Sequence, residues 1–307
     1  APPAPPPQPR VPCIGQSLNF DFFHAVLAWS NLGGLGPDTT APSEIRYVNV
    51  ASIVDPASGM VGYLDLAVVT NGAYTPFDAS NNGLNGKFAR INFAAGTCAD
   101  LRVYVRPSCA SAKPCSVCDD TEINPTSELR EQCYRQGGCA CFGTTVTDPD
   151  ECIGARKEAY RDAYGCGAKM NDDTSFPAGS LISFSIFDLD AGPLGQLVES
   201  CEITGYDYFK TPLRPSNDAD VDSTLSINQQ ETLFTGTAIA LPGEAPLDPN
   251  SLSEVQASRA IEFFFPSSNG YIDARFCIAY TGSGSGGGGD ILFAGSSSLC
   301  APPPPFP

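Results

Sequence analysis

The chain has 307 residues, of which 34 are acidic and 17 basic, and its formal net charge is −17 at pH 7. This charge repels phosphates and argues against a nucleic-acid partner, while 30 glycines and 28 prolines argue against a helical bundle. No run approaches the roughly 18 consecutive apolar residues of a membrane-spanning helix, so we expect no insertion into a membrane.

The chain opens on a proline-rich segment, residues 1–12, which reads APPAPPPQPRVP. Proline fixes φ at about −65° and has no N–H donor, so we expect the extended polyproline II conformation. Such a segment is either a linker or a semi-rigid rod that docks on a neighbouring subunit. It shows no charged n-region and no apolar h-region, and we expect any signal peptide to have been removed already.

Residues 13–108 contain short runs of alternating apolar and polar residues, separated by glycine-rich and Asn-Gly turns. This pattern is typical of an antiparallel sandwich or barrel. In one run Leu101, Val103 and Val105 share a face, and the residues between them share the other. Strands are predicted at 19–29, 45–54, 62–70, 88–93 and 101–106.

Residues 109–170 have a different character, because they hold eight cysteines and the best helix signals. Asp148 and Pro149 supply an N-cap and a first-turn proline, so we predict a helix over 149–164 and a shorter one over 127–135. We interpret 109–170 as a cysteine-rich, partly helical insertion in one β domain. Two separate β domains that flank a small disulfide module are the alternative.

The alternating pattern resumes in residues 171–300, and residues 301–307 form a second proline-rich segment, APPPPFP. We therefore predict a mainly β fold: an antiparallel, jelly-roll-like sandwich with a disulfide-rich, partly helical insertion and polyproline II termini. The later strands are predicted at 181–188, 198–208, 232–241, 260–265, 271–280 and 291–294.

Thirteen cysteines indicate an oxidising, extracytoplasmic compartment, where disulfides persist. The five cysteines outside the insertion are an odd number, so one of them is free, pairs with the insertion or bonds another chain. Cys115-x-x-Cys118 and Cys139-x-Cys141 also match zinc-ligand spacing, but disulfides are the better account in a secreted chain. The disulfide candidates are Cys13, Cys98, Cys109, Cys115, Cys118, Cys133, Cys139, Cys141, Cys152, Cys166, Cys201, Cys277 and Cys300.

The sequence singles out no catalytic constellation. His24 is the only histidine, there is no G-x-S-x-G elbow, and the glycine-rich stretch 282–290 lacks the G-K-[ST] of a phosphate loop. Pairs of carboxylates suited to glycoside hydrolysis exist among 34 acids, but no spacing selects one. We expect that the protein is not an enzyme.

Two acidic stretches are candidate calcium sites, since carboxylate oxygens are the ligands that Ca²⁺ prefers. Asp218, Asp220 and Asp222 alternate within 217–222, without the glycine and distal glutamate of an EF-hand. Asp188 and Asp190, in FDLDAG, are expected on the same side of a strand end. Solvated acidic loops are the other interpretation of both stretches, and no other cofactor is expected.

Any glycan is expected to be O-linked. Asn124 is followed by proline, and no other asparagine has serine or threonine two positions on, so no N-linked acceptor exists. Contiguous prolines are typical of hydroxyproline-rich wall glycoproteins, and polyproline II leaves each ring open to solvent. The candidate positions, as hydroxyproline, are Pro2, Pro3, Pro5, Pro6, Pro7, Pro302, Pro303, Pro304 and Pro305.

Two motifs, SLISFSIFDLDAG at 180–192 and DILFAGSSSL at 290–299, resemble the closing β module of secreted algal and bacterial proteins. The stretch 65–96 resembles the upstream half of that module, whereas the cysteine-rich insertion has no counterpart in these motifs. The whole chain further resembles the extracellular hydroxyproline-rich glycoproteins of green algae, including mastigoneme (flagellar hair) subunits and related glycosylated fibrils. The resemblance implies a β-sandwich protein that assembles into a heavily O-glycosylated extracellular fibril, without catalysis.

Our leading hypothesis is a structural subunit of an extracellular glycosylated fibril or cell-surface appendage, in a cell wall, a matrix or on a flagellar surface. Its partners would be copies of itself, joined head to tail through the proline-rich ends, and O-linked glycans. The alternative is a calcium-dependent, lectin-like adhesion module that uses exposed aromatic side chains. A secreted hydrolase is a third hypothesis.

Overall fold

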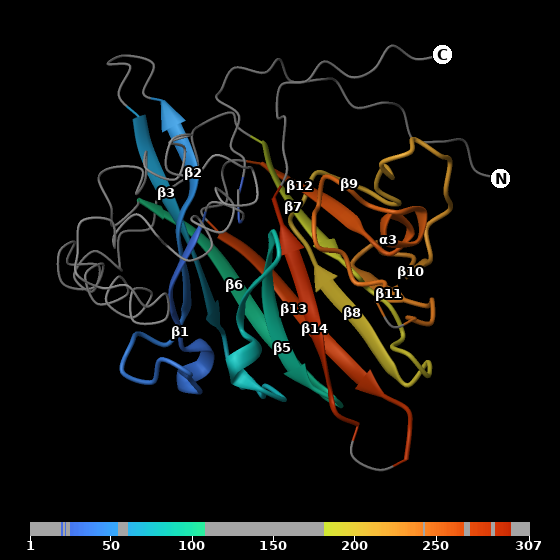
Figure 1. Ribbon diagram of the computed structural model, residues 1–307, viewed down its shortest axis with the longest axis horizontal. Helices are drawn as coiled ribbons and strands as arrows, with labels where there is room; N and C mark the ends of the chain where they lie inside the picture. Colours follow the sequence, from blue (N-terminus) through green and yellow to red (C-terminus); the bar gives the residue numbers. More distant parts are fainter. Residues whose placement is uncertain are drawn as a thin grey trace, which may run out of the picture.

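The computed structural model describes residues 20, 22, 25–54, 61–107, 181–241, 243–266, 271–283 and 286–295. Within these residues the chain forms two antiparallel sheets that pack face to face (Figure 1). The prediction of a mainly β, antiparallel sandwich is therefore confirmed. Both proline-rich ends, His24 and the cysteine-rich insertion with its two predicted helices lie outside the described residues.

One sheet has eight strands in the described part of the chain, and its order is β1-β2-β3-β6-β13-β8-β11-β10. Every pairing within it is antiparallel. The strands are β1 (Val26–Ser30), β2 (Ile45–Val54), β3 (Val61–Thr70), β6 (Thr97–Pro107), β8 (Leu197–Ile203), β10 (Leu225–Ile227), β11 (Leu233–Gly236) and β13 (Tyr271–Tyr280).

The second sheet has six described strands, in the order β4-β5-β14-β7-β12-β9. They are β4 (Gly83–Asn85), β5 (Phe88–Ala94), β7 (Leu181–Phe187), β9 (Tyr208–Lys210), β12 (Ile261–Pro266) and β14 (Gly288–Ala294). The described helices are short: the 3-10 turns η1 (Leu32–Gly34) and η2 (Ala79–Asn81), and α3 (Glu254–Ser258). A capping box between Ser253 and Gln256 begins α3.

Strands from before and after residues 108–180 pair with each other in both sheets. β6 pairs with β13 in the first sheet, and β5 pairs with β14 in the second. In Figure 1 the blue-green strands consequently lie beside the orange-red ones. The described parts of the chain thus form one sandwich rather than two separate β domains.

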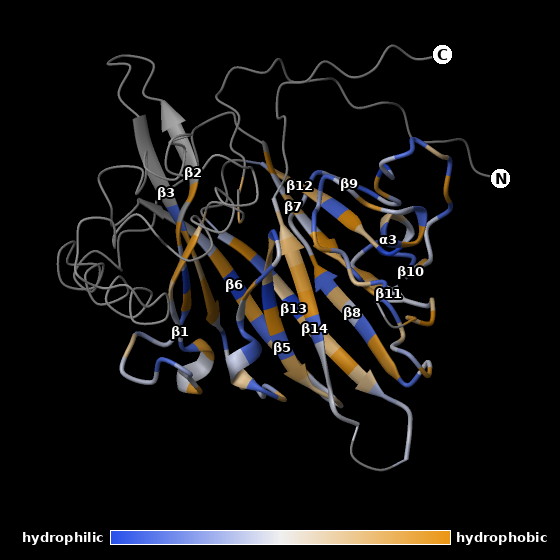
Figure 2. Cartoon of the chain, viewed as in Figure 1, coloured by the Kyte–Doolittle hydropathy of each residue, from blue (hydrophilic) through white to orange (hydrophobic). Residues whose placement is uncertain are grey.

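The core lies between the sheets and is rich in aromatic side chains. The alternation of hydrophobic and hydrophilic residues along the strands is visible in Figure 2, and it directs the apolar side chains to one face. Rings from opposite sheets meet there: Tyr47 and Phe293 lie 6.4 Å apart, and Phe234 and Phe263 lie 5.0 Å apart. Such edge-on pairs contribute about 0.5–1.5 kcal/mol beyond the burial of their area.

Five described elements have no counterpart among the predicted ones, namely η1, η2, β4, β10 and α3. The two strands have three residues each, which is too short for a period-two pattern to show. The predicted strand 198–208 is also two strands, because Gly205, with φ of +80°, turns the chain between Ile203 and Tyr208.

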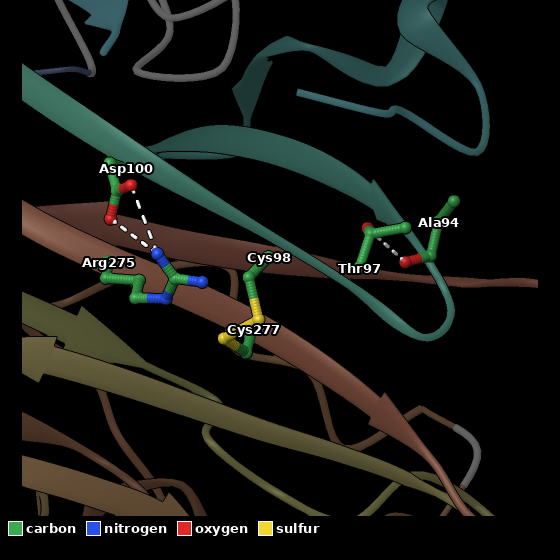
Figure 3. Close-up of a disulfide and its surroundings, with 6 residues drawn as sticks. All are labelled: Ala94, Thr97, Cys98, Asp100, Arg275 and Cys277. Atoms are coloured by element: carbon green, nitrogen blue, oxygen red, sulfur yellow. Dashed lines mark hydrogen bonds and ion pairs between the residues drawn. A yellow bond between two sulfur atoms is a disulfide. The ribbon is translucent and has the colours of Figure 1, made fainter. Parts of the chain in front are cut away.

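A disulfide joins Cys98 of β6 to Cys277 of β13, which stand directly opposite each other (Figure 3). The next opposite pair on this outer face is Asp100 with Arg275. The Nη1 of Arg275 donates a hydrogen bond of 3.1 Å to the Oδ1 of Asp100. The prediction of a disulfide at these two cysteines is confirmed. The prediction for Cys201 is wrong, because this thiol is free and buried. Its inward position on β8 explains the difference, since β8 places it among core side chains.

A candidate cation-binding cavity

Asp188 and Asp190 lie just beyond the end of β7, on one side of the chain. Asp188 has φ of +61°, a left-handed conformation that Asp tolerates better than most residues. Leu189, between the two, is fully buried in the core. Because Leu189 turns inward, the two carboxylates turn the other way and line the same cavity, as expected from the sequence.

The cavity has a volume of about 260 Å³ and lies between the end of β7, the start of β8 and the start of β14. Four carboxylates line it, and its lining includes no lysine or arginine. The lining residues are Asn85, Asp188, Asp190, Gly192, Pro193, Leu197, Glu199, Ala240, Ala245, Gly288, Gly289, Asp290 and Leu292.

Arg259 is the cation behind this cavity, and it is shared among several acids. Its Nη1 lies 3.4 Å from Asp190 and 3.9 Å from Asp188, and its Nη2 lies 2.9 Å from Glu244. Asp190 also accepts a hydrogen bond of 2.7 Å from the N–H of Gly192. One guanidinium therefore offsets only part of the negative charge at this site.

Glu199 brings a carboxylate into the cavity from the inward face of β8. The residue is 7% exposed, and its Oε2 is buried without a hydrogen-bond partner. A buried, unpaired carboxylate is costly, so such groups are ordinarily paired or protonated. The neighbouring Gly289 leaves room beside it, since a Cβ there would lie 2.9 Å from Glu199 Oε1.

Asp290, at the opposite wall, is held by neighbours on β5. Its Oδ1 accepts a hydrogen bond of 2.7 Å from the Asn92 side chain, and its Oδ2 lies 3.6 Å from Arg90. The four carboxylates are therefore unequal. Asp190 and Asp290 have strong partners, while Asp188 and Glu199 keep a buried oxygen without a hydrogen bond.

Burial raises the pKa of three of these acids. The pKa of Asp188 is raised to about 6 by burial and by the Asp190 charge. Burial also raises the pKa of Asp190, and it raises that of Glu199 well above the ordinary value. A cation in the site would favour the charged form of these acids and so lower their pKa values.

Four exposed aliphatic residues lie within two positions of a lining residue in the sequence. Leu194 follows the lining residue Pro193, and Ile239 and Leu241 flank the lining residue Ala240. Leu247 lies two residues after Ala245 and is also exposed. We call these four side chains the apolar rim. Their exposed fractions run from 55% to 77%.

The second candidate calcium stretch is a surface loop. Asp218 is exposed and pairs with Arg214 at 2.5 Å, and Asp220 and Asp222 are also exposed. Within the part of the chain that the structure describes, no three His, Cys, Asp or Glu side chains are grouped so that they could hold a metal ion. Calcium binding at either stretch therefore stays a prediction.

Glu199 and Arg259 are site residues that sequence reasoning missed. Glu199 had a readable signal, since it shares the inward face of β8 with Cys201 and Ile203. An acid in the apolar register of a strand indicates a buried charge. Arg259 follows the five-residue helix α3, where no periodic pattern indicates which side chain turns inward.

Comparisons with known proteins do not assign this chain to a family. No protein-family model matches it, and neither the curated proteins nor the solved structures include a significant match. Among the described residues, no helix has both the length and the hydrophobicity that a bilayer crossing requires.

Proposed function

We propose that the protein is a non-catalytic structural subunit of an extracellular, O-glycosylated fibril or surface appendage, as in the hydroxyproline-rich algal glycoproteins and mastigonemes that its sequence resembles. Copies of the chain would join head to tail through their proline-rich ends. Hydroxylated prolines in those ends would carry the glycans, and the disulfide-bonded sandwich would form the body of each subunit.

The observation that carries this proposal is the bridge between Phe20 and Gly295. The two residues form an isolated antiparallel bridge, in which the N–H of Phe20 donates to the Gly295 carbonyl at 3.1 Å. Phe20 and Gly295 are the first and last described residues, so the described part of the chain begins and ends at one place, beside the end of β14. This shared place supports a role for the two proline-rich segments as a single connecting device.

The packing of the body supports the same role. The larger of two hydrophobic clusters in the described residues draws its members from both sheets and packs the space between them. The cavity of about 260 Å³ is smaller than the roughly 300–1,000 Å³ that drug-sized ligands occupy. A filled sandwich with a small polar recess suits a load-bearing unit.

Truncation tests the proposal directly. Chains that lack residues 1–12 or 301–307 should keep the folded body and lose filaments, because the connecting segments are gone. Electron microscopy of the full-length and truncated proteins, with circular dichroism as the folding control, measures both properties. Filaments of normal length from both truncated chains would contradict the proposal.

The calcium-dependent carbohydrate-binding alternative has one feature in its favour. Tyr208, on the edge strand β9, is partly exposed and stacks on Phe264 with ring centroids 4.3 Å apart. Lys210 lies over the same Phe264 ring. Stacked rings are a common surface for sugars, so binding to a glycan array that is lost in chelator would favour this second function.

A further inference from the structure

We infer that the acidic cavity receives the side chain of Arg10 from a second copy of the chain, with the flanking prolines of that copy lying on the apolar rim. This inference rests on the proposed function, since it names the contact by which one subunit would hold the next.

The cavity is built for a cation. Glu199 is buried, its Oε2 has no hydrogen-bond partner, and it lines the cavity together with Asp188 and Asp190. A positively charged group entering the cavity would supply the missing partner. The described carboxylates are not grouped for a metal ion, whereas a planar guanidinium with five N–H donors can reach several separated acids at once.

The surroundings of the cavity indicate what carries that cation. Leu194, Ile239, Leu241 and Leu247 are exposed, and each lies within two positions of a lining residue. A polyproline II segment presents apolar rings without internal hydrogen bonds, and it loses little conformational entropy on docking. Residues 1–12 combine six prolines in the first nine positions with one basic residue, Arg10.

Other basic residues fit less well. Every Lys and Arg side chain that the structure describes already contacts a carboxylate or an aromatic ring. The bases within 109–170 are interspersed with ten acids, which a negatively charged cavity would repel. Arg10 has Pro9 before it and Pro12 after it, with no acid among residues 1–12.

The positions along β14 suit a contact that joins one copy to the next. Gly288 and Asp290 line the cavity at the start of β14, while the Phe20–Gly295 bridge lies just beyond its other end. At about 3.3 Å per residue, the two places are roughly 20 Å apart. If the N-terminal segment of one copy binds the acidic cavity of the next, the contact is heterologous and repeats from copy to copy.

The test uses a labelled peptide of residues 1–12 and full-length protein that carries Arg10→Gln, so that its own segment does not compete. Fluorescence anisotropy should show saturable binding. A peptide with Arg10→Gln should bind about tenfold more weakly or worse, because a buried charge would lose its partner. Equal affinity of the two peptides would overturn the inference.

Receptor variants locate the binding site. Glu199→Gln in the same protein should weaken peptide binding about tenfold or more, whereas Asp220→Asn, which removes an exposed loop charge, should leave the affinity unchanged. Thermal unfolding checks that both variants fold. Binding should also weaken from pH 8 to pH 5, as Asp188, whose pKa is raised to about 6, takes up a proton beside Asp190, Glu199, Glu244, Asp290 and Arg259. Unaltered affinity in Glu199→Gln would overturn the inference.

Microscopy separates this inference from the proposed function. Full-length Arg10→Gln protein should form no long filaments under conditions in which the native protein does. Normal filaments from Arg10→Gln would overturn the Arg10 contact and leave the fibril proposal standing. A native protein that stays monomeric at high concentration would instead overturn the fibril proposal.

Discussion

At the scale of single residues, the buried acids of the cavity lower the stability of the sandwich when they are charged. Burial disfavours the charged form of Asp188 and Glu199, and Arg259 offsets only part of this cost. Each such acid holds its proton more tightly in the folded chain than in the unfolded chain. The folded state is consequently favoured at low pH, and this advantage is lost as the pH rises through the folded pKa.

Asp188→Asn is the residue-scale prediction. The pKa of Asp188 is raised from 3.8 to about 6, so its destabilising effect is absent below pH 4 and complete above pH 6. We therefore compare the free energy of unfolding of the variant with that of the native protein. The difference in favour of the variant should be about 2 kcal/mol larger at pH 7 than at pH 4. Asparagine also tolerates the left-handed backbone at this position. Urea unfolding at the two pH values measures the difference, with Asp220→Asn as the charge control. A pH-independent effect would contradict the assignment.

The site shows how far residue-level prediction from sequence reaches. Asp188 and Asp190 were expected on one side of a strand end, and both line one cavity. The buried Leu189 between them indicates the inward direction, whereas the left-handed conformation of Asp188 is not specified by an alternating pattern. Asp290 and Asn85 reach the same cavity from β14 and β4. Their contribution depends on which strands become neighbours, and local periodicity carries no information about that.

At the scale of elements, the position of Asp190 depends on a close approach between β11 and the turn that follows β7. A Cβ on Gly236 would lie 2.5 Å from the Cα of Asp190 and 2.5 Å from the carbonyl carbon of Leu189. Both are backbone atoms, which cannot swing away as a side chain would. Glycine at the end of β11 therefore allows that strand to support one wall of the cavity.

Gly236→Ala should destabilise the fold by about 1–3 kcal/mol, the usual cost of forcing extra volume into packed backbone. It should also weaken binding of the peptide of residues 1–12, because Asp190 would move. Thr235→Ala on the same strand adds no atoms and should cost less. Denaturant unfolding and anisotropy measure the two effects. Unchanged stability in Gly236→Ala would refute the close approach.

The strands themselves were predicted better than their pairing. Most long strands match the alternating runs, since one face of each is buried in the shared core. The pairing of β6 with β13 joins residues that are 179 positions apart at the disulfide, and no local pattern specifies it. The short strands β4 and β10 depend on their neighbours for their extended conformation.

At the scale of the whole molecule, the disulfide links a strand that precedes residues 108–180 to a strand that follows them. Cys98 and Cys277 lie on adjacent central strands of the eight-stranded sheet (Figure 3). Arg102 and Asp273 extend the same row of opposite pairs, with Arg102 lying 3.7 Å from the centre of the Tyr271 ring. The covalent link restricts the unfolded chain, and the neighbouring pairs hold the register.

Replacing both Cys98 and Cys277 by alanine should lower the free energy of unfolding by about 2–5 kcal/mol, because the unfolded chain regains the freedom of a long loop. Cys201→Ala is the matched control, since it removes a buried sulfur that closes no loop, and its loss should be smaller. Denaturant unfolding of both variants under non-oxidising conditions compares them. Equal losses would mean that the link contributes nothing beyond packing.

The bridge at Phe20 and the cavity at the start of β14 also determine how a fibre of these subunits would respond to pulling. Tension would enter each subunit at one end of β14 and leave at the other, along the axis of that strand. β14 is hydrogen-bonded to β5 on one side and to β7 on the other, and these bonds run across the strand. Such a force shears both ladders at once instead of opening them bond by bond. In the proposed fibre, β14 would therefore be the strand best placed to resist extension.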